Sequence, residues 1–153
     1  MKKTIVNIAP AVAETPRTKR VAAYARVSCG KDAMLHSLAA QIGYYRDYIM
    51  MNPEWRFAGI YADESKTGTK DNREQFQVLL SECRSGNIDM VITKSISRFA
   101  RNTVTLLETV RELKSLGVDV FFEEQNIYTL SAEGEVMLTL LASFAQAESL
   151  SCS

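Results

Sequence analysis

The sequence predicts an α/β fold in which a mainly parallel sheet of four to five strands is flanked by helices. Short apolar runs of strand length alternate with longer segments whose apolar residues recur at a helical period. This alternation repeats four times, which is typical of a parallel sheet covered on both faces. The last segment, 134–150, is apolar nearly all round, and this predicts a C-terminal interface helix.

The elements follow in a simple order. Residues 1–19 are expected to form an extended or flexible leader, and 20–153 a single domain. The polar stretch 63–73 is long for a connection inside a compact domain, which favours a functional loop. Residues 123–131 are expected to be irregular. The expected strands are 21–27, 57–62, 88–93 and 118–122, and the expected helices are 37–51, 74–84, 103–116 and 134–150.

Composition narrows the class of protein. The 153 residues are 46% apolar and 24% charged, as in a compact globular domain. Eighteen basic residues balance eighteen acidic ones, whereas a dedicated DNA-binding module usually has a strong basic excess. No apolar run approaches the roughly 20 residues that span a bilayer. Three widely spaced cysteines and one histidine indicate a reducing cytosol and no zinc site.

Polar residues follow the expected strands at Ser28, at Asp63 and over 94–101. Because the carboxyl ends of parallel strands meet at one edge, these segments are expected to converge there. The last of them carries Lys94, Arg98 and Arg101 with no acidic residue nearby, which favours an anion site suited to phosphate. If this turn is helical, the two arginines point the same way.

Ser28 is the candidate nucleophile of this edge. Arg26 precedes it by two residues and so shares its side of an extended chain, and Arg73 adds a further guanidinium. Arginines around a serine hydroxyl suit attack on a phosphodiester. Alternatives stay open: Ser28 as a turn or cap residue, the arginines as solvated charges, or Cys29 as nucleophile with His36 as its base.

Other phosphate chemistries lack their motifs. The chain has no Walker A loop and no Cys-x5-Arg loop. No second carboxylate cluster accompanies Asp63, which disfavours a metal-dependent mechanism, so no metal site is expected. Two further classes remain: a non-enzymatic regulatory or assembly module with the same fold, and a small-molecule phosphate-binding α/β domain.

Three segments together resemble the serine site-specific recombinases, the resolvase/invertase family, and within it the large-recombinase and transposon-borne branch. The resemblance runs from about residue 20 to the C-terminus and implies a resolvase-like catalytic domain. The segments are 24–28 (YARVS), 61–73 (YADESKTGTKDNR) and 93–102 (TKSISRFARN).

The resemblance implies a role for each matching residue. Ser28 would attack the scissile DNA phosphate, giving a 5′-phosphoserine link and a free 3′-hydroxyl, with no cofactor. Ser97 stands where many small resolvases have Asp, and a neutral hydroxyl cannot act as a carboxylate base. The phosphate-binding residues would be Arg26, Arg73, Arg98 and Arg101, and the supporting ones Tyr24, Gln41, Asp63, Lys94 and Ser97.

The resemblance also implies partners. Double-stranded DNA would be bound through the full-length protein, which would act as a dimer and, in synapsis, as a tetramer in the bacterial cytoplasm. Family members continue into a DNA-binding region, which is expected to be absent here, so the fragment alone is expected to be inactive. The helix 134–150 would start the long dimerisation helix; the alternative is burial inside the monomer. The expected interface residues are Met137, Leu140, Leu141, Phe144 and Glu148.

Overall fold

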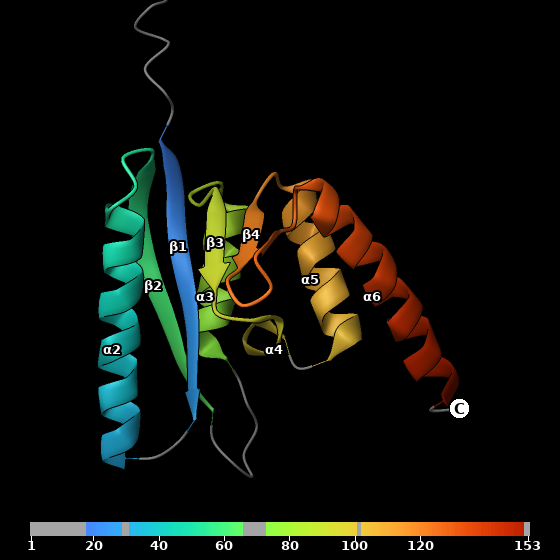
Figure 1. Cartoon of the computed structure of the whole chain (residues 1–153), viewed down its shortest axis with the longest axis horizontal. Coiled ribbons are helices and arrows are strands. Elements are labelled where there is room, and N and C mark those ends of the chain that lie inside the picture. Colours follow the sequence, from blue (N-terminus) through green and yellow to red (C-terminus); the bar gives the residue numbers. More distant parts are fainter. Residues whose placement is uncertain (1–17, 29–30, 66–72, 101, 152–153) are drawn as a thin grey trace, which may run out of the picture.

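A five-stranded sheet in the order β2-β1-β3-β4-β5 forms the centre of the molecule (Figure 1). The computed structural model describes residues 18–28, 31–65, 73–100 and 102–151, with the backbone alone for residues 28, 31–37, 65 and 145–151. β1 to β4 pair in parallel and β5 is antiparallel to β4, which confirms the predicted α/β class. The elements are β1 (Lys19–Ser28), α2 (Lys31–Met50), β2 (Trp55–Ser65), α3 (Glu74–Arg84), β3 (Met90–Thr93), α4 (Ile96–Phe99), α5 (Thr103–Ser115), β4 (Asp119–Phe122), β5 (Ile127–Tyr128) and α6 (Ala132–Ser151).

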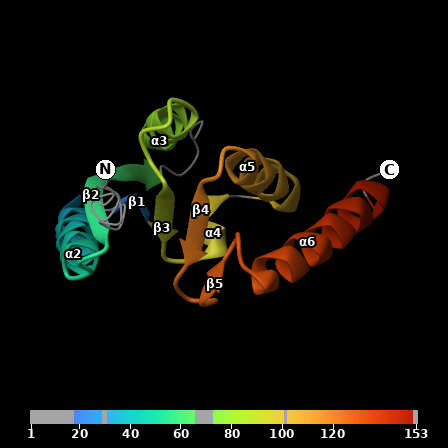
Figure 2. The same ribbon diagram turned by 90° about the horizontal axis from the view of Figure 1, so that it is seen from above.

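Helices cover the two faces of the sheet unequally. Figure 2 shows α3 and α5 on one side and α2 on the other. The larger core joins Tyr24, Phe99 and Phe122 to the buried sides of α3 and α5. On the opposite face Tyr45 and Ile49 of α2 pack on alternate strand residues, as the period of two in a strand requires. β3, β4 and the centre of β1 are therefore buried on both faces, which explains their continuous apolar runs, whereas the outer strand β2 stays partly exposed.

Every expected element other than the helix 74–84 differs from the structure in at least one bound, in most cases by one or two residues. β1 starts at Lys19, one residue inside the expected leader, and α2 starts at Lys31, six residues early, because residues 31–36 lack the apolar period that marks a helix. β2 runs on to Ser65, since polar residues 63–65 still pair with β1. The two-residue strand β5 lies in the stretch expected to be irregular. Helix α3 matches the expected 74–84 at both ends.

One irregularity shapes the pairing of β1 with β2. The register shifts between Val21 and Ala22, which pair with Phe57 and Gly59, so β2 holds one extra residue. Gly59 has φ +121°, a conformation that side chains with a Cβ rarely adopt. The bulge places Tyr24 opposite Tyr61 further along the strands.

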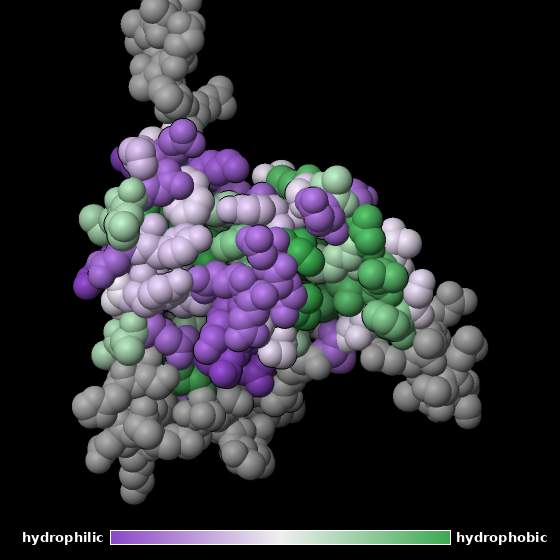
Figure 3. All heavy atoms as spheres, viewed as in Figure 1, coloured by the Kyte–Doolittle hydropathy of each residue, from purple (hydrophilic) through white to green (hydrophobic). Residues whose placement is uncertain are grey.

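The C-terminal helix α6 is buried on one side only. Met137 and Leu138 pack in the core of the same chain, so Met137 is not a surface residue as an interface role would require. Val136, Leu140 and Phe144 remain 60%, 52% and 57% exposed. Figure 3 shows hydrophobic side chains gathered over this part of the surface. Burial of the whole helix inside the monomer is therefore wrong.

At the amino ends of the strands, Arg20 and Asp89 form a bidentate ion pair. Arg20 Nε donates to Oδ2 and Nη2 to Oδ1, each at 3.0 Å, and the Arg20 backbone N–H donates to Oδ2 at 2.8 Å. These bonds hold the pKa of the Asp89 carboxyl below its ordinary value of 3.8. The pair joins β1 to the residue before β3.

We expect Asp89→Asn to flatten the acid dependence of stability. Because the folded pKa of Asp89 is depressed, its stabilisation is complete above pH 3.8 and is lost as pH falls through the folded pKa. Between pH 7 and about pH 3, the free energy of unfolding in urea should therefore fall by less in the variant than in the wild type. Asp47→Asn, at a carboxylate 3.9 Å from Arg46 in an exposed pair, is the control. Equal losses in Asp89→Asn and wild type would contradict the expectation.

Candidate active site

Tyr24, Asp63 and Arg73 form one hydrogen-bonded network near the carboxyl end of β1. The Tyr24 hydroxyl donates to Asp63 Oδ2 at 2.8 Å and accepts from Arg73 Nε at 3.3 Å. Asp63 also accepts from the backbone N–H groups of Gln75 and Phe76, at 2.9 and 3.0 Å. Asp63 therefore caps the start of α3 and fixes Tyr24.

Arg73 enters the network through an unusual backbone. Its φ and ψ are 48° and 52°, in the left-handed region, directly before α3. The guanidinium carbon lies 3.8 Å from the Phe76 ring centroid and 5.2 Å from that of Tyr24. Its Nη2 donates to the Phe99 carbonyl oxygen. A cation stacked on one ring and bonded to two oxygens is held in a defined place at the edge of the core.

The environment of Tyr24 keeps its phenol protonated. Burial raises the pKa of Tyr24 well above its ordinary value, and this outweighs Arg73, whose positive charge and hydrogen bond act to lower it. Asp63 adds to the rise. Tyr24 therefore acts as a donor to Asp63 and an acceptor from Arg73, which is a structural linking role.

A second contact brings α4 to β1. Arg98 Nη1 donates to the carbonyl oxygen of Arg26 at 3.1 Å, two residues before Ser28. The Ser97 hydroxyl lies 3.0 Å from that of Ser95. Since α4 ends at Phe99 and Ala100 is extended, the helical turn expected to align Arg98 with position 101 does not continue.

Gln41 and Lys94 lie together in a different part of this edge. They line a cavity of about 530 Å³ with Ala40, Tyr44, Tyr45, Glu123 and Glu124. Lys94 follows β3 directly, as expected, and Gln41 is on α2. The supporting residues are thus divided among three places, with Tyr24 and Asp63 beside Arg73, Gln41 and Lys94 at this cavity, and Ser97 in α4.

Several of the predicted residues are not described in full. Ser28 is the last residue of β1 and pairs in register with Ser65, with the backbone alone described. Arg101 and Cys29 lie outside the described residues. For His36 in α2 and Glu148 in α6 only the backbone is described.

Three contacts at this edge of the sheet were not predicted from the sequence. They are the carbonyl oxygen of Phe99 as a partner of Arg73, the stacking of Arg73 on Phe76, and the binding of two tyrosines by Glu123. Glu123 directly follows a strand, so the rule that selected Ser28 also applied to it. The contacts of Arg73 depend on its backbone conformation, for which an arginine gives no sequence signal.

The described part of the chain offers neither a metal cluster nor a membrane-spanning helix. No group of three or more His, Cys, Asp or Glu side chains there is arranged to hold a metal ion. Among the helices described, none is long and apolar enough to cross a membrane.

Comparison with known proteins identifies relatives over most of the chain. A transposon Tn3 resolvase of Escherichia coli is 29% identical over 133 residues, covering 84% of this chain and 63% of the resolvase. A transposon Tn21 resolvase of the same species is 34% identical over 119 residues, covering 71% and 61%. A resolvase/recombinase of Pseudomonas putida is 28% identical, covering 86% and 66%. The chain thus spans less than two thirds of the length of these relatives.

Solved structures of recombinases have the same fold as this chain. A resolvase family site-specific recombinase from Streptococcus pneumoniae superposes with a TM-score of 0.73 at 27% identity, covering 88% of this chain and 91% of that one. The N-terminal catalytic domain of TP901-1 integrase gives 0.61 at 25% identity, covering 85% and 96%. The family model described as the resolvase N-terminal domain matches residues 21–152. With the sheet order and the three motifs already in place, this match shows that the chain belongs to the resolvase family of serine recombinase catalytic domains.

Proposed function

We propose that this domain cleaves and rejoins DNA through Ser28. The observation that supports it most is the meeting of Arg73 and Arg98, from two separate segments, at α4 beside the end of the strand that carries Ser28. Arg98 donates to the backbone carbonyl of Arg26, two residues before the serine. Arg73 donates to the backbone carbonyl of Phe99, the residue that follows Arg98. Both cations are held by backbone oxygens, which positions charge with little loss of freedom on phosphate binding.

The proposed chemistry balances without an external energy source. Ser28 Oγ bonds to phosphorus, the bond from phosphorus to the 3′ oxygen breaks, and the serine proton ends on the 3′-hydroxyl. Rejoining reverses these changes when a 3′-hydroxyl attacks the phosphoserine. One phosphate ester replaces another at each step, so neither a nucleotide nor another cofactor is required.

The arginines retain capacity for a phosphate in this arrangement. A guanidinium has five N–H donors. The bonds described for Arg73 use two of them and the bond described for Arg98 uses one. We propose that Arg26 and Arg101 complete the phosphate site, with Tyr24 and Asp63 holding Arg73, while Gln41, Lys94 and Ser97 support the surrounding segments.

The partners follow from the same proposal. Double-stranded DNA is bound through the remaining part of a longer protein, consistent with the zero net charge of this chain. Subunits associate through the exposed side of α6, as dimers and then as a tetramer, in the bacterial cytoplasm. Leu140, Phe144 and Val136 supply the apolar area for this contact.

The test is a covalent trap. The full-length protein is incubated with a nicked suicide DNA carrying its recombination site, and the linked peptide is mapped by mass spectrometry. We expect an adduct on Ser28 in the wild type and in Cys29→Ser, and none in Ser28→Ala. An adduct that persists in Ser28→Ala, or that maps to Cys29, would overturn the proposal.

A further inference from the structure

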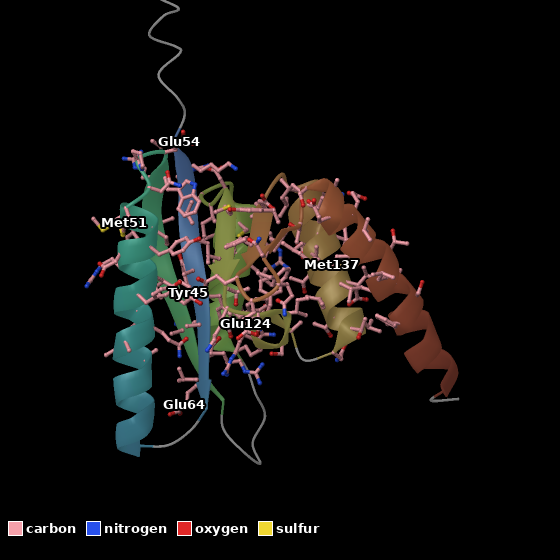
Figure 4. The ribbon with its side chains drawn as sticks, viewed as in Figure 1. Tyr45, Met51, Glu54, Glu64, Glu124 and Met137 are labelled. Atoms are coloured by element: carbon pink, nitrogen blue, oxygen red, sulfur yellow. The ribbon has the colours of Figure 1, made fainter. Side chains whose placement is uncertain are left out.

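One carboxylate at the end of β4 receives two phenols from α2. Tyr44 donates to Glu123 Oε2 at 2.6 Å and Tyr45 donates to Oε1 at 2.8 Å. The two tyrosine rings meet edge to face with centroids 5.1 Å apart. Both oxygens of Glu123 are thereby bonded to the same helix. Figure 4 shows Tyr45 on the side of α2 that faces the sheet.

The backbone that carries Glu123 is itself fixed to the segment that leads into α4. The Glu123 N–H donates to the Thr93 carbonyl at 3.0 Å, and the Glu124 N–H donates to that of Lys94 at 2.8 Å. The Asn126 N–H donates back to Glu123 at 3.1 Å and closes a turn. We call residues 123–126 the bridging turn.

The bridging turn also contacts α4. The side-chain oxygen of Gln125 accepts from the backbone N–H of Ile96, the first residue of α4, at 3.3 Å. The turn therefore binds α2 through Glu123 and α4 through Gln125. Figure 4 places Glu124, between these two residues, beside α4.

These two helices flank the candidate site. α4 carries Arg98, whose guanidinium binds the Arg26 carbonyl, and α2 starts three residues after Ser28. In the part of α2 whose side chains are described, the buried ones are Tyr45 and Ile49, in its second half. Tyr44 lies 13 residues after the start of α2, which is roughly 20 Å along a helix axis. A small tilt at this anchor becomes a large displacement at the end nearest Ser28.

Tyr45 packs on the sheet, but on the side of the anchor that faces the Lys94 segment an open cavity replaces packed side chains. The cavity of about 530 Å³ lined by Gln41, Tyr44, Lys94 and Glu123 separates α2 from the Lys94 segment there. Across a cavity, van der Waals contacts are missing, so there the hydrogen bonds add a constraint that the core packing of Tyr45 and Ile49 does not supply. The bonds from the two tyrosines to Glu123 cross this gap.

We propose that Glu123 is a positioning residue that holds α2 at a fixed distance from α4, and so places the Ser28 segment relative to the arginines. This inference rests on the proposed recombinase function for its consequence in catalysis. The hydrogen-bonding geometry on which it depends is independent of that function.

The first arm of the test uses this chain without DNA. Glu123→Ala is compared with Glu124→Ala, a matched exposed neighbour, and with Glu123→Gln, whose amide still reaches both phenols. We expect amide hydrogen exchange in α2 to rise about tenfold in Glu123→Ala only. The hydrogen bond raises the pKa of Tyr44 to about 12, and ultraviolet titration should show it returning toward 10.0 in Glu123→Ala.

The second arm uses the full-length protein and a plasmid carrying its recombination site. Glu123→Ala should lower the rate constant of Ser28 adduct formation roughly 10- to 100-fold while leaving DNA affinity unchanged. Glu123→Gln should recover most of the rate, and Glu124→Ala should match the wild type. A normal rate in Glu123→Ala, or an equal loss in Glu124→Ala, overturns the proposal.

The two hypotheses fail in different ways. If the wild type forms no Ser28 adduct, the proposed function is wrong, and unchanged exchange in α2 would separately show that Glu123 does not hold the helix. If the wild-type adduct forms and Glu123→Ala reacts at the same rate, the function stands and the positioning role is wrong.

Discussion

Asp63→Ala is expected to lower the free energy of unfolding by about 3 kcal/mol. The carboxylate accepts two backbone N–H groups at the start of α3 and the hydroxyl of Tyr24. Loss of a helix cap costs roughly 0.5–2 kcal/mol. A buried hydroxyl left without its acceptor costs roughly 1–3 kcal/mol, and Tyr24 is fully buried. Urea unfolding monitored by circular dichroism at pH 7 measures the sum.

Tyr24→Phe is the matched control for this prediction. It removes one of the three hydrogen bonds to Asp63, together with the bond that Tyr24 accepts from Arg73, and keeps the ring, which packs edge to face on Phe76 with centroids 5.0 Å apart. We expect a loss of about 1 kcal/mol. If Asp63→Ala lost no more than Tyr24→Phe, the two backbone bonds would contribute nothing to stability, and the capping role would be refuted.

The prediction of Asp63 from sequence shows how far local pattern reaches. Its place at the carboxyl edge of the sheet was predictable, because it follows an apolar strand. Its partners were not, since the N–H groups of Gln75 and Phe76 lie beyond a connection that carries no apolar period. The strand itself proved longer than expected, because residues 63–65 continue to pair with β1 although they are polar.

The buried side of a helix was predictable where its apolar residues form one stripe. It was not predictable where apolar residues surround the helix, because tertiary contacts then determine which side is buried. In α3 the residues Phe76, Leu79, Leu80 and Cys83 recur at a helical period, and all four are buried. In α6 the apolar residues surround the helix, so the pattern gave no orientation. The structure resolves this by burying Met137 and leaving Leu140 and Phe144 exposed. The start of α6 also lies close to the backbone at the end of β5, and the sequence marks this approach only by a glycine.

That glycine leads to the second large expected effect: Gly134→Ala should destabilise the domain by about 1–3 kcal/mol. In most helices Gly→Ala stabilises by roughly 0.5–1 kcal/mol. At Gly134 an added Cβ would lie under 3.0 Å from the backbone carbonyl oxygens of Tyr128 and Thr129, closer than real Cβ atoms come. Backbone cannot rotate away as a side chain can, so either β5 or the start of α6 must move.

Gly43→Ala provides a control of opposite sign. Gly43 is also helical, in α2, and a Cβ built there meets no atom within 4 Å. It should stabilise the domain by about 0.5–1 kcal/mol. Urea unfolding of both variants separates helix propensity, which they share, from the contact with β5, which only Gly134 makes. If the two variants shifted stability in the same direction, α6 would not be seated on the β5 backbone as the structure has it. If they shift in opposite directions, the close contact between Gly134 and the carbonyls of Tyr128 and Thr129 constrains where the first turn of α6 lies.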